Sequence, residues 1–277
     1  MTMSSEVALS GDLLLLGAGK MGGAMLHGWL DRGIPPARII ALDPSPPAEI
    51  AHTIARHGIR HNPALADVER VEVLVLAIKP QNFDEVLPAL AGLKSHCPLV
   101  LSIAAGRTMA GIERHFGEDA AVIRAMPNVP AAIGRGITAM VANPNVSASQ
   151  LGLAQLLLQA VGEVVRVEDE GLMDAVTAVS GSGPAYVFYL AECLAEAGIA
   201  AGLPEELAIK LARATVSGAG ELMQASGRPA AELREMVTSP KGTTYEALAV
   251  LMAEGGLKTL LAKAVAAAAR RSRELAR

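Results

Sequence analysis

Three glycines near the N-terminus have the spacing with which dinucleotide-binding proteins hold a pyrophosphate. Gly17, Gly19 and Gly22 follow the apolar run Leu13 to Leu16 in a G-x-G-x-x-G pattern. In this pattern the first glycine allows a tight turn, the second lets the backbone approach the phosphates, and the third lets the next helix pack on the strand. The unpaired N–H groups and positive dipole end of that helix would bind the phosphates. The pattern therefore predicts a dinucleotide site.

Two charged side chains follow later strands of the predicted sheet. Asp43 lies at the place of an acid that bonds the adenosine ribose hydroxyls, or it is the N-cap of the next helix. Lys79, at the end of an apolar strand, would neutralise a phosphate or a carboxylate, or it is a surface charge beside a turn. Ligands collect at the carboxyl ends of parallel strands, where both residues are expected.

Two polar loops stand out in the second half. The segment 180–184 (SGSGP) separates two predicted helices, and its serines either line a pocket or simply belong to a connection. The segment 238–244 (TSPKGTT) precedes a helix whose first N–H groups have no partner within the helix, so it could hold a carboxylate. The alternative is that Thr243 or Thr244 only caps that helix.

The histidines limit the possible chemistry. All six lie in the first half, without the spacing of a catalytic triad or a metal site, so we expect no metal. A second half without histidine is poorly suited to general acid/base catalysis at neutral pH. It suits the reduction of an already protonated C=N bond, which requires binding, alignment and exclusion of water.

Periodicity divides the chain into two parts. Strands are expected at 13–16, 38–42, 59–61, 71–78, 99–103, 121–124, 137–142 and 163–167, and helices between them at 21–30, 48–57, 82–93, 109–116 and 148–161. Only helices are expected afterwards, at 172–179, 185–201, 204–225, 230–237, 245–253 and 257–275. The fold class is therefore α/β, with a Rossmann-type doubly wound sheet in a domain at 1–168 and an all-helical domain at 169–277. Small residues recur in the later helices and favour an intimate dimer.

Composition narrows the class further. The 277 residues are 51% hydrophobic, but only 3% are aromatic and no apolar run is long enough for a membrane span. A net charge of −4 gives no electrostatic reason to expect nucleic-acid binding. The N-terminus lacks the pattern of a signal peptide, and Cys97 and Cys193 are far apart, so we expect a cytoplasmic protein with reduced cysteines.

Six segments in order resemble the pyrroline-5-carboxylate reductase family over nearly the whole chain. They are GAGKMGGAM from Gly17, LAIKP from Leu76, SIAAG from Ser102, RAMPNVPA from Arg124, DAVTAVSGSGPAYVF from Asp174 and MVTSPKGTTYEAL from Met236. The resemblance implies reduction of 1-pyrroline-5-carboxylate to L-proline by NADPH or NADH, the last step of proline biosynthesis. It also implies a homodimer, and in many members a ring of dimers.

The same resemblance implies the site residues. The coenzyme-binding residues would be Gly17, Gly19, Lys20 and Met21 at the pyrophosphate, Ser45 at the adenosine ribose, Asn62, Ala77, Lys79 and Pro80 along the trough, and Met126, Pro127 and Asn128 at the nicotinamide. The substrate-binding residues would be Ser239, Gly242, Thr243 and Thr244, with Ser180 and Ser182 closing the pocket. Thr244 would be the catalytic residue, because its hydroxyl is the expected partner of the substrate nitrogen.

Three positions depart from the family pattern. Lys241 replaces a usual glycine, which strains the backbone if φ is positive there and otherwise adds a charge attractive to a carboxylate. Val129 replaces a usual threonine, and Asp43 places a carboxylate near the ribose, where it would disfavour a 2′-phosphate. The departure at Asp43 favours NADH and the family habit favours NADPH.

Two other functions share part of this sequence pattern. A 3-hydroxyacid dehydrogenase would share the glycine pattern but usually has a catalytic lysine in the helix after 183, where this chain has none before Lys210. A non-catalytic NAD(P)-binding sensor would report through the helical half, but no DNA-binding helix or basic patch supports it.

Overall fold

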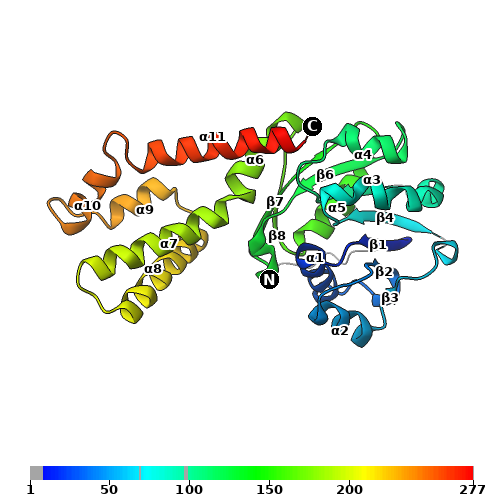
Figure 1. The fold of residues 1–277 in the computed structure, drawn as a ribbon, viewed down its shortest axis with the longest axis horizontal. Coiled ribbons are helices and arrows are strands. Elements are labelled where there is room, and N and C mark those ends of the chain that lie inside the picture. The colour runs from blue at the N-terminus through cyan, green and yellow to red at the C-terminus, as the bar shows by residue number, and fades with distance from the viewer. Residues whose placement is uncertain (1–8, 69, 97–98, 277) are drawn as a thin grey trace. The chain divides into compact units, whose positions relative to one another are not determined.

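The computed structural model describes residues 9–68, 70–96 and 99–276 (Figure 1). Its contacts define two compact units. The first, called the sheet unit, holds the described residues up to Gly181 and from Ala269 onward, and the second, the helical unit, is Ser182–Ala268. Cys97 and the N-terminal residues 1–8 lie outside the described residues.

The sheet unit is built on one eight-stranded sheet with the strand order β3-β2-β1-β4-β5-β6-β7-β8. The strands are β1 Asp12–Leu16, β2 Ile39–Leu42, β3 Arg60–His61, β4 Val71–Leu76, β5 Leu99–Ser102, β6 Val122–Met126, β7 Gly136–Ala142 and β8 Gly162–Arg166. In β1, the leucines 13–16 are at most 5% exposed, as expected of a strand covered on both faces. The doubly wound sheet predicted from the sequence is confirmed.

Helices cover both faces of this sheet (Figure 1). One face packs against α1 Lys20–Asp31, α2 Ala48–His57 and α5 Ala148–Gln159, around the fully buried Trp29. The opposite face packs against α3 Phe83–Val86, α4 Met109–Phe116 and α6 Met173–Val176, around the fully buried Phe83. The Trp29 indole N–H donates to the Leu157 carbonyl at 3.0 Å, so even this ring leaves no unsatisfied polar atom.

The β7 strand runs antiparallel to β6, which the alternating pattern had not indicated. The two strands are joined by residues 127–135 alone, which contain the short 3₁₀ helix Val129–Ile133. A parallel crossover needs a dozen or more residues, so this connection can only turn the chain back. The β8 strand then pairs parallel to β7 after a crossover through α5.

The prediction of a helix at 82–93 is wrong over most of that range. Only Phe83–Val86 is α-helical, and Leu87–His96 continues as 3₁₀ turns. Pro88 explains the change, because a proline cannot donate the i→i−4 hydrogen bond and its ring collides with the preceding turn.

The helix expected at 172–179 also differs. The structure has a 3₁₀ turn at Glu170–Leu172, the single turn of α6, and then a π-helix at Thr177–Gly181. The hydroxyls of Thr177 and Ser180 donate to carbonyls four residues earlier, at 2.8 and 3.0 Å. Such back-bonding perturbs regular α-helical turns, and π turns are frequent at functional sites.

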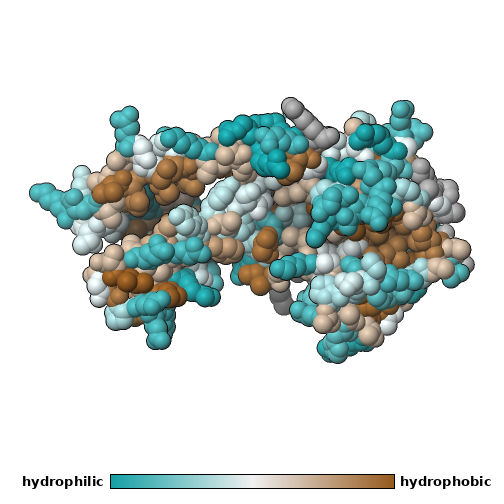
Figure 2. All heavy atoms as spheres, in the orientation of Figure 1, coloured by the Kyte–Doolittle hydropathy of each residue, from teal (hydrophilic) through white to brown (hydrophobic). Residues whose placement is uncertain are grey.

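The helical unit contains α7 Gly183–Ala200, α8 Glu205–Ser226, α9 Ala230–Met236, α10 Thr243–Leu251 and most of α11 Leu257–Leu275. Helices α7 and α8 pack closely because small residues meet, and a Cβ on Gly198 would lie 3.4 Å from that of Ala208. Many large apolar side chains of this unit are exposed, including Phe188 and Val250, and Figure 2 shows apolar surface on these helices. Exposure on this scale marks a surface that binds a partner.

None of the helices in the described part of the chain has the length and apolarity that crossing a membrane requires.

Candidate functional site

The glycine-rich turn has the backbone geometry that its three glycines were expected to provide. Gly17 has φ of 92°, which favours glycine, and its N–H donates to the Leu42 carbonyl at 2.8 Å. A Cβ on Gly22 would lie 2.1 Å from the Gly17 oxygen, so α1 approaches β1 as closely as a glycine allows. A Cβ on Gly19 would have nothing within 4 Å, which leaves the backbone there open to a ligand.

The carboxyl ends of β1, β2 and β4 bring the other expected residues to this turn. The Ala77 N–H donates to the Leu16 carbonyl at 2.8 Å, and a Cβ on Gly22 would lie 3.3 Å from the Ala77 Cβ. Strand β1 lies between β2 and β4, where the strand order changes direction. In open α/β sheets, ligands bind at such switch points.

Asp43 joins the glycine-rich turn to the loop after β2. One carboxylate oxygen accepts the Ala18 N–H at 2.7 Å and the other accepts the Ser45 N–H at 2.8 Å. The alternative that Asp43 caps the following helix is wrong, because the N-cap of α2 is Pro47. Asp43 therefore fixes the backbone of the site and puts a negative charge beside it.

Asn62 in turn holds Asp43. Its carboxamide oxygen accepts the Asp43 N–H and its nitrogen donates to the Asp43 carbonyl, both at 2.9 Å. Asn62 has φ of 48°, a left-handed conformation that asparagine tolerates better than most residues. The Asn62 side chain, which was expected to line the coenzyme trough, therefore also holds the backbone of Asp43 in place.

The loop after β4 is held by a residue that sequence reasoning missed. Arg107 donates from Nε to the Pro80 carbonyl at 2.9 Å, and its guanidinium lies 5.2 Å from the centre of the Phe83 ring. Lys79 is exposed at the start of this loop, so its ammonium is available to a ligand. Arg107 directly follows the SIAAG segment, and its position beside a motif was the only signal in the sequence.

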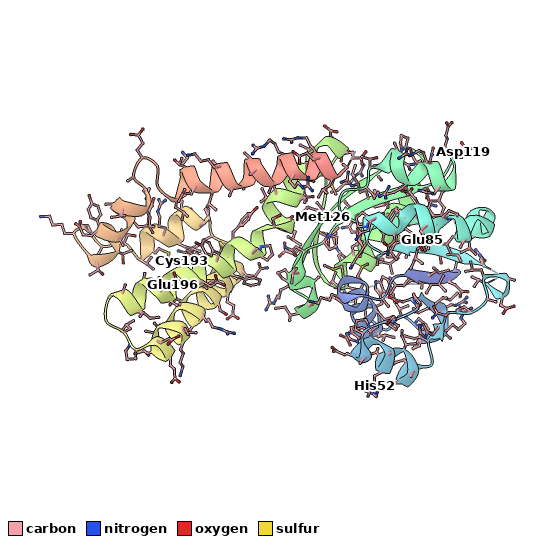
Figure 3. The ribbon with its side chains drawn as sticks, viewed as in Figure 1. His52, Glu85, Asp119, Met126, Cys193 and Glu196 are labelled. Carbon is pink, nitrogen blue, oxygen red and sulfur yellow. The ribbon has the colours of Figure 1, made fainter. Side chains whose placement is uncertain are left out.

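At the carboxyl end of β6, Met126 and Asn128 face the π-helix (Figure 3 labels Met126). Asn128 is buried, and its carboxamide nitrogen donates to the Ser180 carbonyl at 3.1 Å. Ser180 lies within the π-helix, whereas Ser182 precedes α7 in the helical unit. Val129 is exposed and makes no polar contact through its side chain.

An ion pair between the buried Arg124 and the half-buried Glu170 supports the same end of the sheet. Arg124 on β6 donates to a Glu170 carboxylate oxygen at 2.8 Å, and the same oxygen accepts the Met109 N–H at 2.7 Å. Both contacts fasten the segment before α6 to β6 and α4. Breaking such a pair would leave an uncompensated buried charge.

In the helical unit, the expected substrate residues form a turn at the start of α10. The Gly242 N–H donates to the Ser239 carbonyl at 3.0 Å, and a Cβ on Gly242 would lie 2.4 Å from the Ser239 hydroxyl oxygen. Lys241 has φ of 59°, so the strained alternative weighed for this position is the one observed. Pro240 followed by a residue of positive φ is typical of a type II turn.

Thr243 and Thr244 are the first two residues of α10, and the N-cap is Gly242 without any side-chain hydrogen bond. The alternative that a threonine caps this helix is therefore wrong. The Glu246 N–H already donates to the Gly242 carbonyl, so the N–H groups of residues 243–245 precede the intrahelical ladder and point out of the helix end. Thr243 is exposed and Thr244 half-buried.

The residues at the sheet edge fit a dinucleotide. The first turn of α1 contains no acidic residue, Lys20 lies there exposed, and a Cβ on Gly19 would meet no atom, so the helix end itself offers neither like charge nor bulk to a pyrophosphate. Among the described residues, no group of three His, Cys, Asp or Glu side chains is placed to hold a metal ion.

One side chain away from these positions has a perturbed pKa. The pKa of the Tyr189 phenol on α7 is raised, first by its hydrogen bond with Cys193 and then by the charges of that residue and of Glu196. Figure 3 labels Cys193 and Glu196 on the same helix. Tyr189 is exposed, so this shift belongs to the surface of the helical unit.

A glycine-rich turn at the switch point of a doubly wound sheet, followed by a helical unit, defines a Rossmann-type oxidoreductase. Residues 13–106 match the family model described as NADP oxidoreductase, coenzyme F420-dependent, and residues 170–275 match that of pyrroline-5-carboxylate reductase dimerisation. A pyrroline-5-carboxylate reductase of Synechocystis sp. is 44% identical over 96% of this chain and 99% of its own length. The chain belongs to the pyrroline-5-carboxylate reductase family.

Two solved structures extend the likeness to the fold. The pyrroline-5-carboxylate reductase of Coxiella burnetii has a TM-score of 0.90 at 34% identity, covering 97% of this chain and 100% of its own. The pyrroline carboxylate reductase of Plasmodium falciparum, solved with NADP bound, has a TM-score of 0.81 at 27% identity, covering 97% and 99%.

Proposed function

We propose that this chain reduces 1-pyrroline-5-carboxylate to L-proline with NADPH or NADH, consuming one proton. The observation that carries this proposal is similarity to a reductase of this name across nearly the full length of both chains. The open backbone at Gly19 and the turn before α10 support it independently, because they are suited to a pyrophosphate and a carboxylate respectively.

The coenzyme, when bound, supplies the hydride. In the proposal the N–H groups at the start of α1 and the Lys20 ammonium hold its pyrophosphate, and Ser45 and Asp43 face the adenosine ribose. The trough beyond is lined by residues after β3, β4 and β6, namely Asn62, Ala77, Lys79, Pro80, Met126 and the backbone of Pro127 and Asn128.

The substrate carboxylate is held, in the proposal, by Ser239, Gly242 and Thr243 and by the N–H groups that begin α10. A helix N-terminus stabilises an anion through its dipole and its free donors. Ser180 and Ser182 would close the pocket, and the Lys241 ammonium adds attraction for the same carboxylate.

Reduction of a protonated imine requires little proton transfer by side chains of the protein. The ring nitrogen of a protonated imine already carries the proton that proline keeps, so the Thr244 hydroxyl only has to accept its hydrogen bond and fix the ring. Alignment and exclusion of water then account for most of the catalysis. This agrees with a helical unit that contains no histidine.

We also propose that the helical unit forms the homodimer, through the apolar side chains that it exposes, and that the protein acts in the cytoplasm. The match to a dimerisation model over residues 170–275 supports the first point. The free thiol of Cys193 agrees with a reducing compartment. A ring of dimers stays a prediction, which the mass of the assembly in solution would test.

The test is the oxidation of NADPH and NADH with pyrroline-5-carboxylate, followed optically together with proline formation. We expect one proline for each coenzyme oxidised. Binding of coenzyme without its oxidation would favour a sensor. Faster oxidation of a 3-hydroxyacid by NAD(P)⁺ would favour a hydroxyacid dehydrogenase.

A further inference from the structure

The carboxamide of Asn128 connects two segments of the sheet unit. Its oxygen accepts the Ile137 N–H at 2.9 Å and its nitrogen donates to the Ser180 carbonyl at 3.1 Å. The first partner can only donate and the second can only accept, so the orientation of the carboxamide is fixed. Asn128 is 9% exposed, which leaves its side chain little surface for a ligand.

The sequence explains why the Ser180 carbonyl needs this donor. An α-helical partner would be the N–H of residue 184, but residue 184 is proline and has none. A π-helical partner would be the Ala185 N–H, but that group donates to the Ser182 carbonyl at 3.0 Å. The Asn128 side chain therefore supplies the hydrogen bond that the helix cannot supply.

A second contact fixes the same turn. The Met126 methyl would lie 2.7 Å from a Cβ on Gly181, closer than any real Cβ is approached. Residue 181 must therefore be glycine while Met126 keeps this position. Both contacts come from the carboxyl end of β6 or the loop that follows it, and both reach the π-helix.

We propose that Asn128 is a positioning residue, which acts through the Ser180 carbonyl and sets the π-helical turn for substrate binding rather than contacting the coenzyme with its side chain. This inference rests on the proposed function, because it takes the Ser180 segment as part of the substrate pocket. It assigns Asn128 a role different from the direct coenzyme contact that the family resemblance implies.

The variant Asn128→Asp tests the proposal with almost no change of shape. With its carboxyl group ionised, the variant keeps the acceptor for the Ile137 N–H and removes the donor to the Ser180 carbonyl, so the assays are run at alkaline pH. We expect kcat/KM for pyrroline-5-carboxylate to fall about tenfold or more, as for the loss of a buried hydrogen bond. The Kd of NADPH, measured by fluorescence titration, should stay within about twofold, and amide hydrogen exchange in residues 177–181 should become faster.

Asn143 offers a control at the opposite end of β6. It is 6% exposed and accepts the Val122 N–H at 3.1 Å, and its nitrogen donates to the Ala120 carbonyl at 2.8 Å and to a Glu113 carboxylate oxygen at 2.9 Å. Asn143→Asp therefore loses two hydrogen bonds and faces a second carboxylate, so it is the more severe local change, but it lies far along the strand from the π-helix. At a temperature well below unfolding, we expect it to keep the kcat/KM of the natural chain and normal exchange in residues 177–181.

A second variant keeps the test decisive if Asn128→Asp does not fold. Asn128→Ala removes the same donor without burying a charge, with the same expected pattern of kinetics and exchange. The proposal is overturned if either folded variant raises the coenzyme Kd while the kinetics with pyrroline-5-carboxylate stay unchanged, or if Asn128→Asp behaves like Asn143→Asp. If the natural chain does not reduce pyrroline-5-carboxylate at all, the proposed function fails, and the exchange data alone still decide whether Asn128 holds the turn.

Discussion

The turns before helices α1 and α10 both expose the first N–H groups of a helix, but their backbones differ. Both leave the first N–H groups of a helix without intrahelical partners, which we propose bind an anion, but the first has glycine at its positive φ and the second has Lys241. The first is also tied from outside, by the Asp43 carboxylate on the Ala18 N–H. The turn before α1 is thus free of steric strain and is held by a side chain outside it. The turn before α10 has a strained backbone at Lys241, and that residue also carries a positive charge.

The largest expected effect comes from filling the close contact of the first turn. Gly22→Ala would put a methyl 2.1 Å from the Gly17 oxygen, and we expect coenzyme binding to be lost and the free energy of unfolding to fall by about 1–3 kcal/mol. Fluorescence titration and thermal melting measure both. Gly19→Ala is the matched control, because its methyl meets no atom within 4 Å, so it should weaken coenzyme binding but leave the melting temperature unchanged.

The next effect concerns the second turn. Thr244→Val removes the hydroxyl proposed to bind the substrate nitrogen, and we expect kcat/KM for pyrroline-5-carboxylate to fall about 100-fold, as for the loss of one preorganised polar group. Thr244→Ser should restore most of the activity, and the Kd of NADPH should not change. Full activity in the valine variant would remove Thr244 from the catalytic site.

A smaller effect is expected where Asp43 braces the first turn. Asp43→Asn removes the charge proposed to lie beside the ribose, and it also exchanges one of the two oxygens that accept a backbone N–H for an amide nitrogen. The ratio of kcat/KM for NADPH to that for NADH should rise about tenfold, within the range of a unit charge near a phosphate. Glu49→Gln removes an exposed charge from the first turn of α2 and is the control, with the ratio expected to stay constant. An equal rise in both variants would mean that only the net charge matters.

The smallest effect is expected at Lys241, whose positive φ distinguishes the turn before α10 from the turn before α1. Lys241→Gly should raise the free energy of unfolding by about 1 kcal/mol, because glycine adopts positive φ without steric conflict. It should also raise the KM for pyrroline-5-carboxylate through the loss of the ammonium. Lys241→Gln keeps the strain and removes the charge, so it should share the higher KM but not the gain in stability. Equal stability in all three chains would show that the turn is not strained.

Features that depend on local rules could be predicted from the sequence, whereas features that depend on distant partners could not. Strand β1, the glycine pattern and the change to helices follow from local rules, because burial on two faces and tight turns each restrict residue types. Helices α2, α4 and α11 begin and end where periodicity places them. The direction of β7 depended on the length of one connection, and the sheet-edge brace by Asp43 depended on which backbone amides the fold brings to its carboxylate.

The remaining features depend on long-range partners. The π-helix at Thr177–Gly181 forms where Asn128, far away in sequence, supplies a donor to Ser180. The sequence allowed either a positive φ or an ordinary φ at Lys241, and only the structure shows that φ is positive. Arg107 was missed because the fold, and not the local sequence, brings it to its partners, the Pro80 carbonyl and the Asp84 carboxylate.

The central claim is that this chain transfers a hydride from the nicotinamide to the carbon of the C=N bond of pyrroline-5-carboxylate. The most direct test supplies coenzyme with deuterium at both positions of nicotinamide C4 and examines the proline by mass spectrometry. We expect proline that carries one deuterium, bound to Cδ, the ring carbon that was part of the C=N bond. Unlabelled proline, or oxidised coenzyme without proline, would contradict it.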